Sequence, residues 1–286
     1  MATLADKDTR VLIQGITGYE GSFHARKMIE YGTKVVGGVT PCKGGEWLDD
    51  KPIFDSVKAA VAATGAEASV IFVPPTSATD AILEAVDAEI PLIVCITDGI
   101  PVQDMMKVYE YVGRSKSRLL GPNCPGLLIP GQTKIGTMPG DIAIPGNIAV
   151  ISKSGALTYE VVQALTNAGM GQSICVGIGG DPIVGTSFID LLHMFENDPK
   201  TEKIVVLGEI GGSAEMGAAQ YIKAHMTKPV AAFIAGKSAP EETRMGHAGA
   251  IVEGGEGTVA EKIMALKEGG VRVAEIPDEI PSLLKE

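Results

Sequence analysis

A histidine in a glycine-rich segment is the residue whose surroundings best suit catalysis. His247 stands in Arg244-Met-Gly-His-Ala-Gly-Ala250, where small neighbours allow another group to approach closely. The other histidines, His24, His193 and His225, fall in stretches with helical periodicity and need no chemical role. A loop imidazole with little bulk around it can act as a nucleophile or as an acid and base. We therefore take His247 as the first catalytic candidate.

A carboxylate is the natural partner for such an imidazole. A nucleophilic histidine needs one ring nitrogen held by an acceptor and the other left free. Glu209, in Leu207-Gly-Glu-Ile-Gly-Gly212, is expected at the C-terminal end of a strand, and ligand sites in open α/β sheets gather at such ends. A helix-capping role for this carboxylate is the alternative.

Two glycine turns could hold anions. Ser152-Lys-Ser-Gly155 lies between an expected strand and an expected helix, and it offers hydroxyls, a cation and free backbone N–H groups. Gly15-Ile-Thr-Gly18-Tyr-Glu-Gly21 also follows a strand and opens a helix, the context of a phosphate-binding turn. An ordinary N-cap serine and a tight turn without ligand are the respective alternatives.

The end of the second expected strand indicates which nucleotide the first turn suits. A nicotinamide-binding fold has an Asp or Glu about 20 residues after its glycines, where it holds the ribose. Here the strand ends Val39-Thr-Pro-Cys-Lys43, with a lysine and no acid. Lys43 suits a ligand with an additional phosphate, such as coenzyme A (CoA), although NADP and a merely solvated lysine stay open.

The composition excludes several classes of protein. The 286 residues are 45% hydrophobic and 21% charged, and the net charge of −11 gives no basic face for nucleic acid. No apolar run reaches the roughly 18 residues of a membrane span, and the N-terminus resembles neither a signal nor a transit peptide, so we expect a cytoplasmic protein. The four cysteines are scattered without metal-ligand spacing. We expect reduced thiols and no metal site.

Alternating apolar and amphipathic stretches must position these residues, and they predict βαβ units in two domains. The expected strands are 10–15, 34–39, 68–73, 91–96, 118–121, 148–151, 173–176, 204–207, 230–234 and 271–273. The expected helices are 22–31, 77–87, 102–112, 157–168, 187–196, 215–225 and 258–267. Because a Pro- and Gly-rich segment begins at Gly121, we divide the chain into domains 1–121 and 122–286.

The motifs together resemble one family along nearly the whole chain, the α subunits of succinyl-CoA synthetases, which are acid–CoA ligases. The stretches that carry the resemblance are Gln14-Gly-Ile-Thr-Gly18, Gly37-Gly-Val-Thr-Pro41, Lys43-Gly-Gly45, Gly121-Pro-Asn-Cys-Pro-Gly126, Ser152-Lys-Ser-Gly155, Leu157-Thr-Tyr-Glu160, Val176-Gly-Ile-Gly-Gly-Asp-Pro182, Gly208-Glu-Ile-Gly-Gly-Ser213 and Arg244-Met-Gly-His-Ala-Gly249.

The resemblance implies a fold and a set of roles. A Rossmann-like CoA-binding domain would precede a flavodoxin-like domain that carries a phosphohistidine. His247 would carry the phosphoryl group between the CoA and nucleotide sites, Glu209 would orient it, Ser154 and Gly155 would hold phosphoryl oxygens, and Tyr159 would lie at the acid site. The residues implied for CoA binding are Thr17, Gly18, Tyr19, Glu20, Lys43, Ile96, Thr97 and Asp98.

The resemblance also implies partners and a reaction. A separate β subunit would bind ATP or GTP with Mg²⁺, in an αβ or α2β2 complex. The reaction would join succinate to CoA through an acyl phosphate, as in the tricarboxylic acid cycle. The alternatives are an α-type subunit of malate–CoA ligase or of another acid–CoA ligase, a non-enzymatic CoA-binding regulator, and a nicotinamide oxidoreductase.

Overall fold

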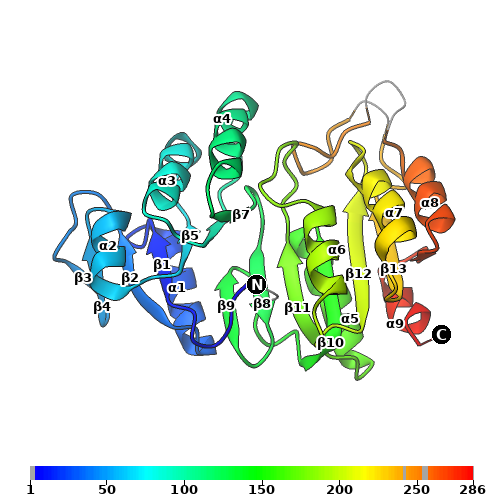
Figure 1. Ribbon diagram of the computed structural model, residues 1–286, viewed down its shortest axis with the longest axis horizontal. Helices are drawn as coiled ribbons and strands as arrows, with labels where there is room; N and C mark the ends of the chain where they lie inside the picture. The colour runs from blue at the N-terminus through cyan, green and yellow to red at the C-terminus, as the bar shows by residue number, and fades with distance from the viewer. Residues whose placement is uncertain (1–3, 241–242, 253–256, 286) are drawn as a thin grey trace.

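The computed structural model describes residues 4–240, 243–252 and 257–285. Two seven-stranded sheets stand side by side along the longest axis of the molecule, with helices against their faces (Figure 1). The first sheet contains strands up to Leu120 and the second contains strands from Gly126 onward. In the described part of the chain, no helix has both the length and the apolar character needed to cross a membrane.

The first sheet has the strand order β3-β4-β2-β1-β5-β6-β7. Only the short edge pair β3–β4 is antiparallel, and the remaining strands reproduce the Rossmann order 3-2-1-4-5-6. The strands are β1 (Val11–Gln14), β2 (Val35–Val39), β3 (Trp47–Leu48), β4 (Lys51–Phe54), β5 (Ala68–Ile71), β6 (Leu92–Cys95) and β7 (Arg118–Leu120). The helices are α1 (Tyr19–Tyr31), α2 (Val57–Thr64), α3 (Pro75–Asp87) and α4 (Val102–Gly113).

The second sheet has the order β14-β13-β12-β10-β11-β8-β9. Its parallel strands, counted from β10, follow the flavodoxin-like order 2-1-3-4-5, and the antiparallel hairpin β8–β9 extends the sheet beyond β11. The strands are β8 (Gly126–Ile129), β9 (Thr133–Gly136), β10 (Pro145–Ser152), β11 (Gln172–Gly177), β12 (Lys203–Glu209), β13 (Val230–Ala235) and β14 (Arg272–Val273). The helices are α5 (Gly155–Asn167), α6 (Phe188–Glu196), α7 (Ala214–His225), α8 (Val259–Glu268) and α9 (Ile280–Leu283).

The predicted fold class is therefore confirmed, and each predicted helix and strand is present within a few residues of its expected bounds. The unpredicted elements are α2, the 3-10 helix Pro277–Glu279, α9, the β3–β4 pair and the β8–β9 hairpin. The hairpin lies in the Pro- and Gly-rich segment at which we divided the chain into domains. A Cβ on Gly126 would stand 2.0 Å from the Ile135 carbonyl oxygen, so this glycine permits close strand pairing instead of interrupting it.

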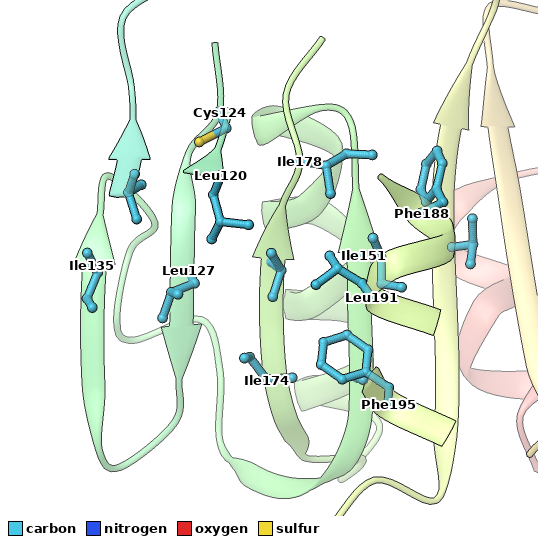
Figure 2. Close-up of a cluster of buried hydrophobic side chains, with 14 of the residues drawn as sticks. Leu120, Cys124, Leu127, Ile135, Ile151, Ile174, Ile178, Phe188, Leu191 and Phe195 are labelled. Atoms are coloured by element: carbon cyan, nitrogen blue, oxygen red, sulfur yellow. The ribbon is translucent and has the colours of Figure 1, made fainter. Parts of the chain in front are cut away.

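One hydrophobic core crosses the seam between the sheets. It runs from Leu120 of the first sheet through Leu127 and Ile135 of the hairpin to Phe188 and Phe195 of α6 (Figure 2). A continuous apolar core holds the two sheets in a defined relation, since separating them would expose these side chains to water.

A threonine of the first half also caps the edge of the second sheet. Thr33 directly follows the glycine that ends α1, and its hydroxyl donates to the Lys134 carbonyl at 2.7 Å while accepting from the Lys134 N–H at 3.0 Å. Lys134 lies on the edge strand β9, whose outer backbone groups would otherwise lack a partner.

Both predicted anion turns lie where their sheet changes winding direction. In the first sheet β1 stands between β2 and β5, and the turn 15–21 leaves its carboxyl end. In the second sheet β10 stands between β11 and β12, and Ser152–Gly155 leaves its carboxyl end. Open parallel sheets bind ligands at such switch points, because the adjacent loops diverge to opposite faces and leave a crevice.

Candidate active site

His247 and Glu209 meet at the carboxyl end of the second sheet. The histidine Nδ1 lies 3.0 Å from Glu209 Oε1 and 2.8 Å from Oε2. Glu209 is the last residue of β12 and its side chain is largely buried, whereas His247 comes from the loop between β13 and α8 and is partly exposed. A carboxylate accepts the Nδ1 proton, so the neutral ring carries its free electron pair on Nε2.

Glycines give the histidine loop its position. A Cβ on Gly180 would stand 2.2 Å from the His247 Cγ, so no larger residue fits beneath the ring. The Gly249 N–H donates to the Gly180 carbonyl at 3.0 Å, which fastens the histidine loop to the segment after β11. Gly211 has a φ of +86°, and a Cβ there would stand 2.1 Å from the Gly249 carbonyl oxygen.

The charged groups around His247 shift the pKa of its ring. The hydrogen bond that His247 donates to Glu209 raises the pKa of His247 above its ordinary value, and burial opposes this shift. The charges of Glu209 and Asp181 raise the pKa further, and the Lys153 ammonium lowers it. The same surroundings stabilise any positive charge that develops on the ring when Nε2 forms a bond.

The serine turn lies on the strand beside Glu209. The Lys153 N–H donates to the Leu207 carbonyl at 3.1 Å, which joins the turn to β12 two residues before its end. Ser154 is the N-cap of α5, and its hydroxyl accepts the Leu157 N–H at 3.4 Å. Gly155 starts the helix, and the nearest atom to a Cβ placed on it would be 3.6 Å away. The positive end of a helix dipole thus follows the strand adjacent to β12, the strand that carries Glu209.

Tyr159 lies one turn into the same helix. Its hydroxyl is 3.3 Å from Thr137 Oγ1, on the residue after β9, and a Cβ on Gly155 would be 3.7 Å from that hydroxyl. Burial raises the pKa of Tyr159, so the phenol is protonated at neutral pH. The tyrosine therefore places a hydroxyl pair close to the start of α5.

The first four CoA candidates surround the N-terminus of α1. Gly18 is the N-cap of the helix, and the Thr17 hydroxyl donates to Thr40 Oγ1 at 3.1 Å at the end of β2. Tyr19 is exposed over 82% of its surface. Glu20 lies 3.5 Å from His24 Nε2, one turn along the helix. These residues form one patch at the carboxyl ends of β1 and β2.

The remaining CoA candidates follow β2 and β6 of the first sheet. Lys43 is half exposed and lies 3.2 Å from the Glu46 carboxylate. Ile96, Thr97 and Asp98 follow β6, where the Thr97 hydroxyl donates to the Val73 carbonyl at 2.6 Å and Asp98 is exposed. These candidates thus lie along the carboxyl edge of one sheet, where Lys43 follows β2 and Asp98 follows β6.

A path of hydrogen bonds that we did not expect from the sequence connects this edge to the histidine. The Asn123 N–H donates to the Thr97 carbonyl at 2.9 Å, and the Asn123 side chain donates to Asp181 at 2.9 Å. The Gly180 N–H donates to the Asn123 carbonyl at 3.2 Å. Burial raises the pKa of Asp181. Asn123 thus connects Thr97, one of the CoA candidates, to Gly180, the residue beneath the His247 ring.

The chain matches known families and proteins over most of its length. A family described as CoA binding domain matches residues 6–99, and one described as CoA-ligase matches residues 151–272. The chain is 54% identical over 275 residues to succinate–CoA ligase [ADP-forming] subunit alpha 1 of Archaeoglobus fulgidus, covering 96% of this chain and 94% of the relative. It is 53% identical over 286 residues to the corresponding alpha subunit of Staphylococcus aureus, covering 100% and 95%.

Solved structures share the fold. The ATP citrate lyase of Methanothrix soehngenii, in complex with citrate and coenzyme A, superposes with a TM-score of 0.91 at 24% identity, covering 99% of this chain and 50% of that chain. A dinucleotide-forming acetyl-coenzyme A synthetase of Ca. Korarchaeum cryptofilum superposes with a TM-score of 0.73 at 22% identity, covering 94% and 58%. The sequence identities over the whole chain decide the family: this chain belongs to the alpha subunits of ADP-forming succinate–CoA ligases.

Proposed function

We propose that this chain forms succinyl-CoA together with a nucleotide-binding β subunit, and that His247 carries the phosphoryl group. Membership of the family makes the chain an acid–CoA ligase subunit with succinate as the acid. The observation that carries the proposed mechanism is the contact of His247 Nδ1 with both oxygens of Glu209, at 3.0 and 2.8 Å. This contact leaves Nε2 as the nucleophile.

The reaction then has three balanced steps. His247 Nε2 attacks the terminal phosphorus of the nucleoside triphosphate, and the nucleoside diphosphate leaves. A carboxylate oxygen of the acid attacks the phosphorus of phosphohistidine, which forms an acyl phosphate and restores the neutral imidazole. The CoA thiolate attacks the acyl carbon, inorganic phosphate leaves, and the thioester remains.

The chain contributes a defined group to each step. Glu209 stabilises the positive charge on His247 while the ring is bonded to phosphorus. Ser154 and Gly155 offer a hydroxyl and backbone N–H groups to phosphoryl oxygens at the start of α5, and Tyr159 offers a hydroxyl to the acid. The carboxyl edge of the first sheet holds CoA.

The proposed CoA site uses the same type of turn. Thr17, Gly18, Tyr19 and Glu20 surround the N-terminus of α1, which suits a phosphate group, and Lys43 supplies a positive charge nearby. Ile96, Thr97 and Asp98 lie on the side toward Asn123, from which a bound thiol could reach the acid site. We further propose that residues 1–121 form the CoA-binding domain and residues 122–286 the ligase domain.

An experiment on the assembled complex tests which acid is the substrate. The complex is phosphorylated with ATP and Mg²⁺, freed from nucleotide, and mixed with CoA and succinate, malate or citrate in turn. We expect rapid loss of the protein-bound phosphoryl group with succinate and CoA together. Discharge by malate or citrate and not by succinate would contradict the assignment of the acid while retaining the mechanism.

A further inference from the structure

A group of buried charges lies directly beneath the histidine pair. The Lys262 side chain is fully buried, and its Nζ donates to the Glu209 carbonyl at 2.6 Å, to the Gly211 carbonyl at 2.6 Å and to Glu215 Oε2 at 2.5 Å. The other oxygen of Glu215, Oε1, lies 2.9 Å from Lys153 Nζ. The three side chains come from α8, from the first turn of α7 and from the serine turn after β10.

These buried charges bind both the backbone N–H and the carbonyl of Glu209. Glu215 Oε1 also accepts the Glu209 N–H at 3.3 Å, while Lys262 binds the Glu209 carbonyl. Gly208 makes room for the contact, because a Cβ there would stand 2.6 Å from the Glu215 Cγ. The backbone that carries the His247 partner is thus fixed from both sides by charged side chains.

A buried ion network of this kind is a poor device for stability alone. The desolvation cost of buried charges offsets much of their attraction, and apolar side chains of similar volume often stabilise a protein equally well. Glu215 and Lys262 are both fully buried, so both side chains are completely desolvated. The network has a specific geometric effect. The Glu215 carboxylate joins the proposed phosphate turn, through Lys153, to the strand end that carries Glu209.

We propose that Lys153, Glu215 and Lys262 are positioning residues for phosphoryl transfer, which hold Glu209 at the angle and distance that aim His247 Nε2. This inference rests on the proposed function of His247. None of the three is required to touch a substrate. A small displacement of a reacting group is costly, since about 1 Å can reduce a rate by about 100-fold.

The charged groups that face His247 come from three elements. They are Glu209 at the end of β12, Asp181 after β11 and Lys153 after β10. Loss of the Glu215 charge leaves Lys153 and Lys262 without their common counter-ion and loosens Glu209. Both effects lower the pKa of His247, so the network can be tested by a pH profile that a purely structural role would not shift.

The test uses the complete complex with Glu215→Gln or Lys262→Met in this chain. Single-turnover phosphorylation of His247 by ATP is measured as a function of pH, together with the KM for CoA. We expect the rate of either variant to fall between about 10-fold and about 100-fold, and the KM for CoA to stay unchanged. For Glu215→Gln we also expect the pH midpoint to move to lower values. Glu196→Gln is the matched control. The Glu196 carboxylate accepts the Thr227 N–H at 3.0 Å, and it is not part of the network beneath the histidine pair.

The outcomes separate the two proposals. Folded variants that phosphorylate at the parental rate with an unshifted pH midpoint would contradict the positioning role alone. A parental complex without phosphohistidine would contradict the proposed function itself. If the single variants do not fold, the double variant Glu215→Leu with Lys262→Met removes both buried charges together, and we expect it to fold and to phosphorylate slowly. Rapid phosphorylation by that folded double variant would again overturn the inference.

Discussion

One carboxylate controls the protonation of His247, and this has a consequence for stability. The Glu209 hydrogen bond raises the pKa of His247 above the ordinary value of 6.5. A raised pKa in the folded state means that the folded protein binds the proton more tightly than the unfolded chain does. The resulting stabilisation is complete below the unfolded pKa and is lost as the pH rises through the folded pKa.

Replacing Glu209 by Gln therefore has a pH-dependent effect. We expect the variant to lose more unfolding free energy at about pH 6 than at about pH 9, because the charged pair exists only on the acid side. Urea unfolding of both proteins across this range measures the difference. Equal destabilisation at both pH values would contradict a charged pair between these residues.

The space beneath the imidazole gives a second prediction at this scale. In Gly180→Ala the added methyl group would stand 2.2 Å from the His247 Cγ, so the ring must move away from its aligned position. We expect phosphohistidine formation to slow by about 100-fold, measured in a single turnover. Gly217→Ala on α7 is the control, since its Cβ would meet nothing closer than 3.8 Å. A parental rate in Gly180→Ala would show that the ring position is not critical.

Single residues differed in how far the sequence revealed them. His247 and Glu209 could be predicted because small neighbours and a strand end mark a place where a side chain meets a ligand. Asn123 and Asp181 could not, because their contact joins segments 58 residues apart. Lys262 left a detectable signal: it lies between Val259 and Leu266 on the buried stripe of α8, where a lysine needs buried partners.

At the scale of elements, two N-cap serines can be compared, of which one lies at the proposed phosphate turn and the other does not. Ser154 caps α5 beside the proposed phosphate turn, and Ser187 caps α6 in a capping box with Asp190. Replacing either serine by Ala is expected to cost about 1 kcal/mol of unfolding free energy, from the lost cap. Only Ser154→Ala is expected to slow phosphorylation of His247 as well. Equal phosphorylation rates in the two variants would leave Ser154 with a capping role alone.

Strand and helix periodicity predicted most elements, and the failures have different physical origins. Val57–Thr64 forms α2, although six of its eight positions are small or polar and its apolar face is narrow. The β8–β9 hairpin contains glycines that usually interrupt strands, and it forms because the glycines allow close backbone pairing. In the hairpin tertiary packing outweighs the local preference, whereas α2 has good helix formers but too little periodicity to be detected.

At the scale of the molecule, the seam between the sheets must keep the proposed CoA site aligned with His247. Thr33 is buried and pairs with both backbone groups of Lys134 across this seam. Thr33→Val leaves those groups unsatisfied, and we expect a loss of about 1–3 kcal/mol in unfolding free energy. We also expect slower discharge of phosphohistidine by succinate and CoA, with unchanged phosphorylation by ATP.

A control separates the seam from a general loss of stability. Thr64→Val removes a hydroxyl that bonds only within α2, to the Ala60 carbonyl. We expect this variant to keep both rates. If Thr33→Val also keeps its discharge rate while losing stability, alignment across the seam is not limiting.

The measurement that tests the central claim most directly is the identification of the phosphorylated residue. The complex with its β subunit is incubated with ATP and Mg²⁺, and mass spectrometry under conditions that preserve acid-labile phosphate locates the modification. We predict one phosphoryl group on His247, absent in His247→Asn and retained in His193→Asn, whose histidine lies on α6. A complex that binds CoA but carries no phosphoryl group on His247, or an unchanged rate of succinyl-CoA formation in His247→Asn, would contradict the account.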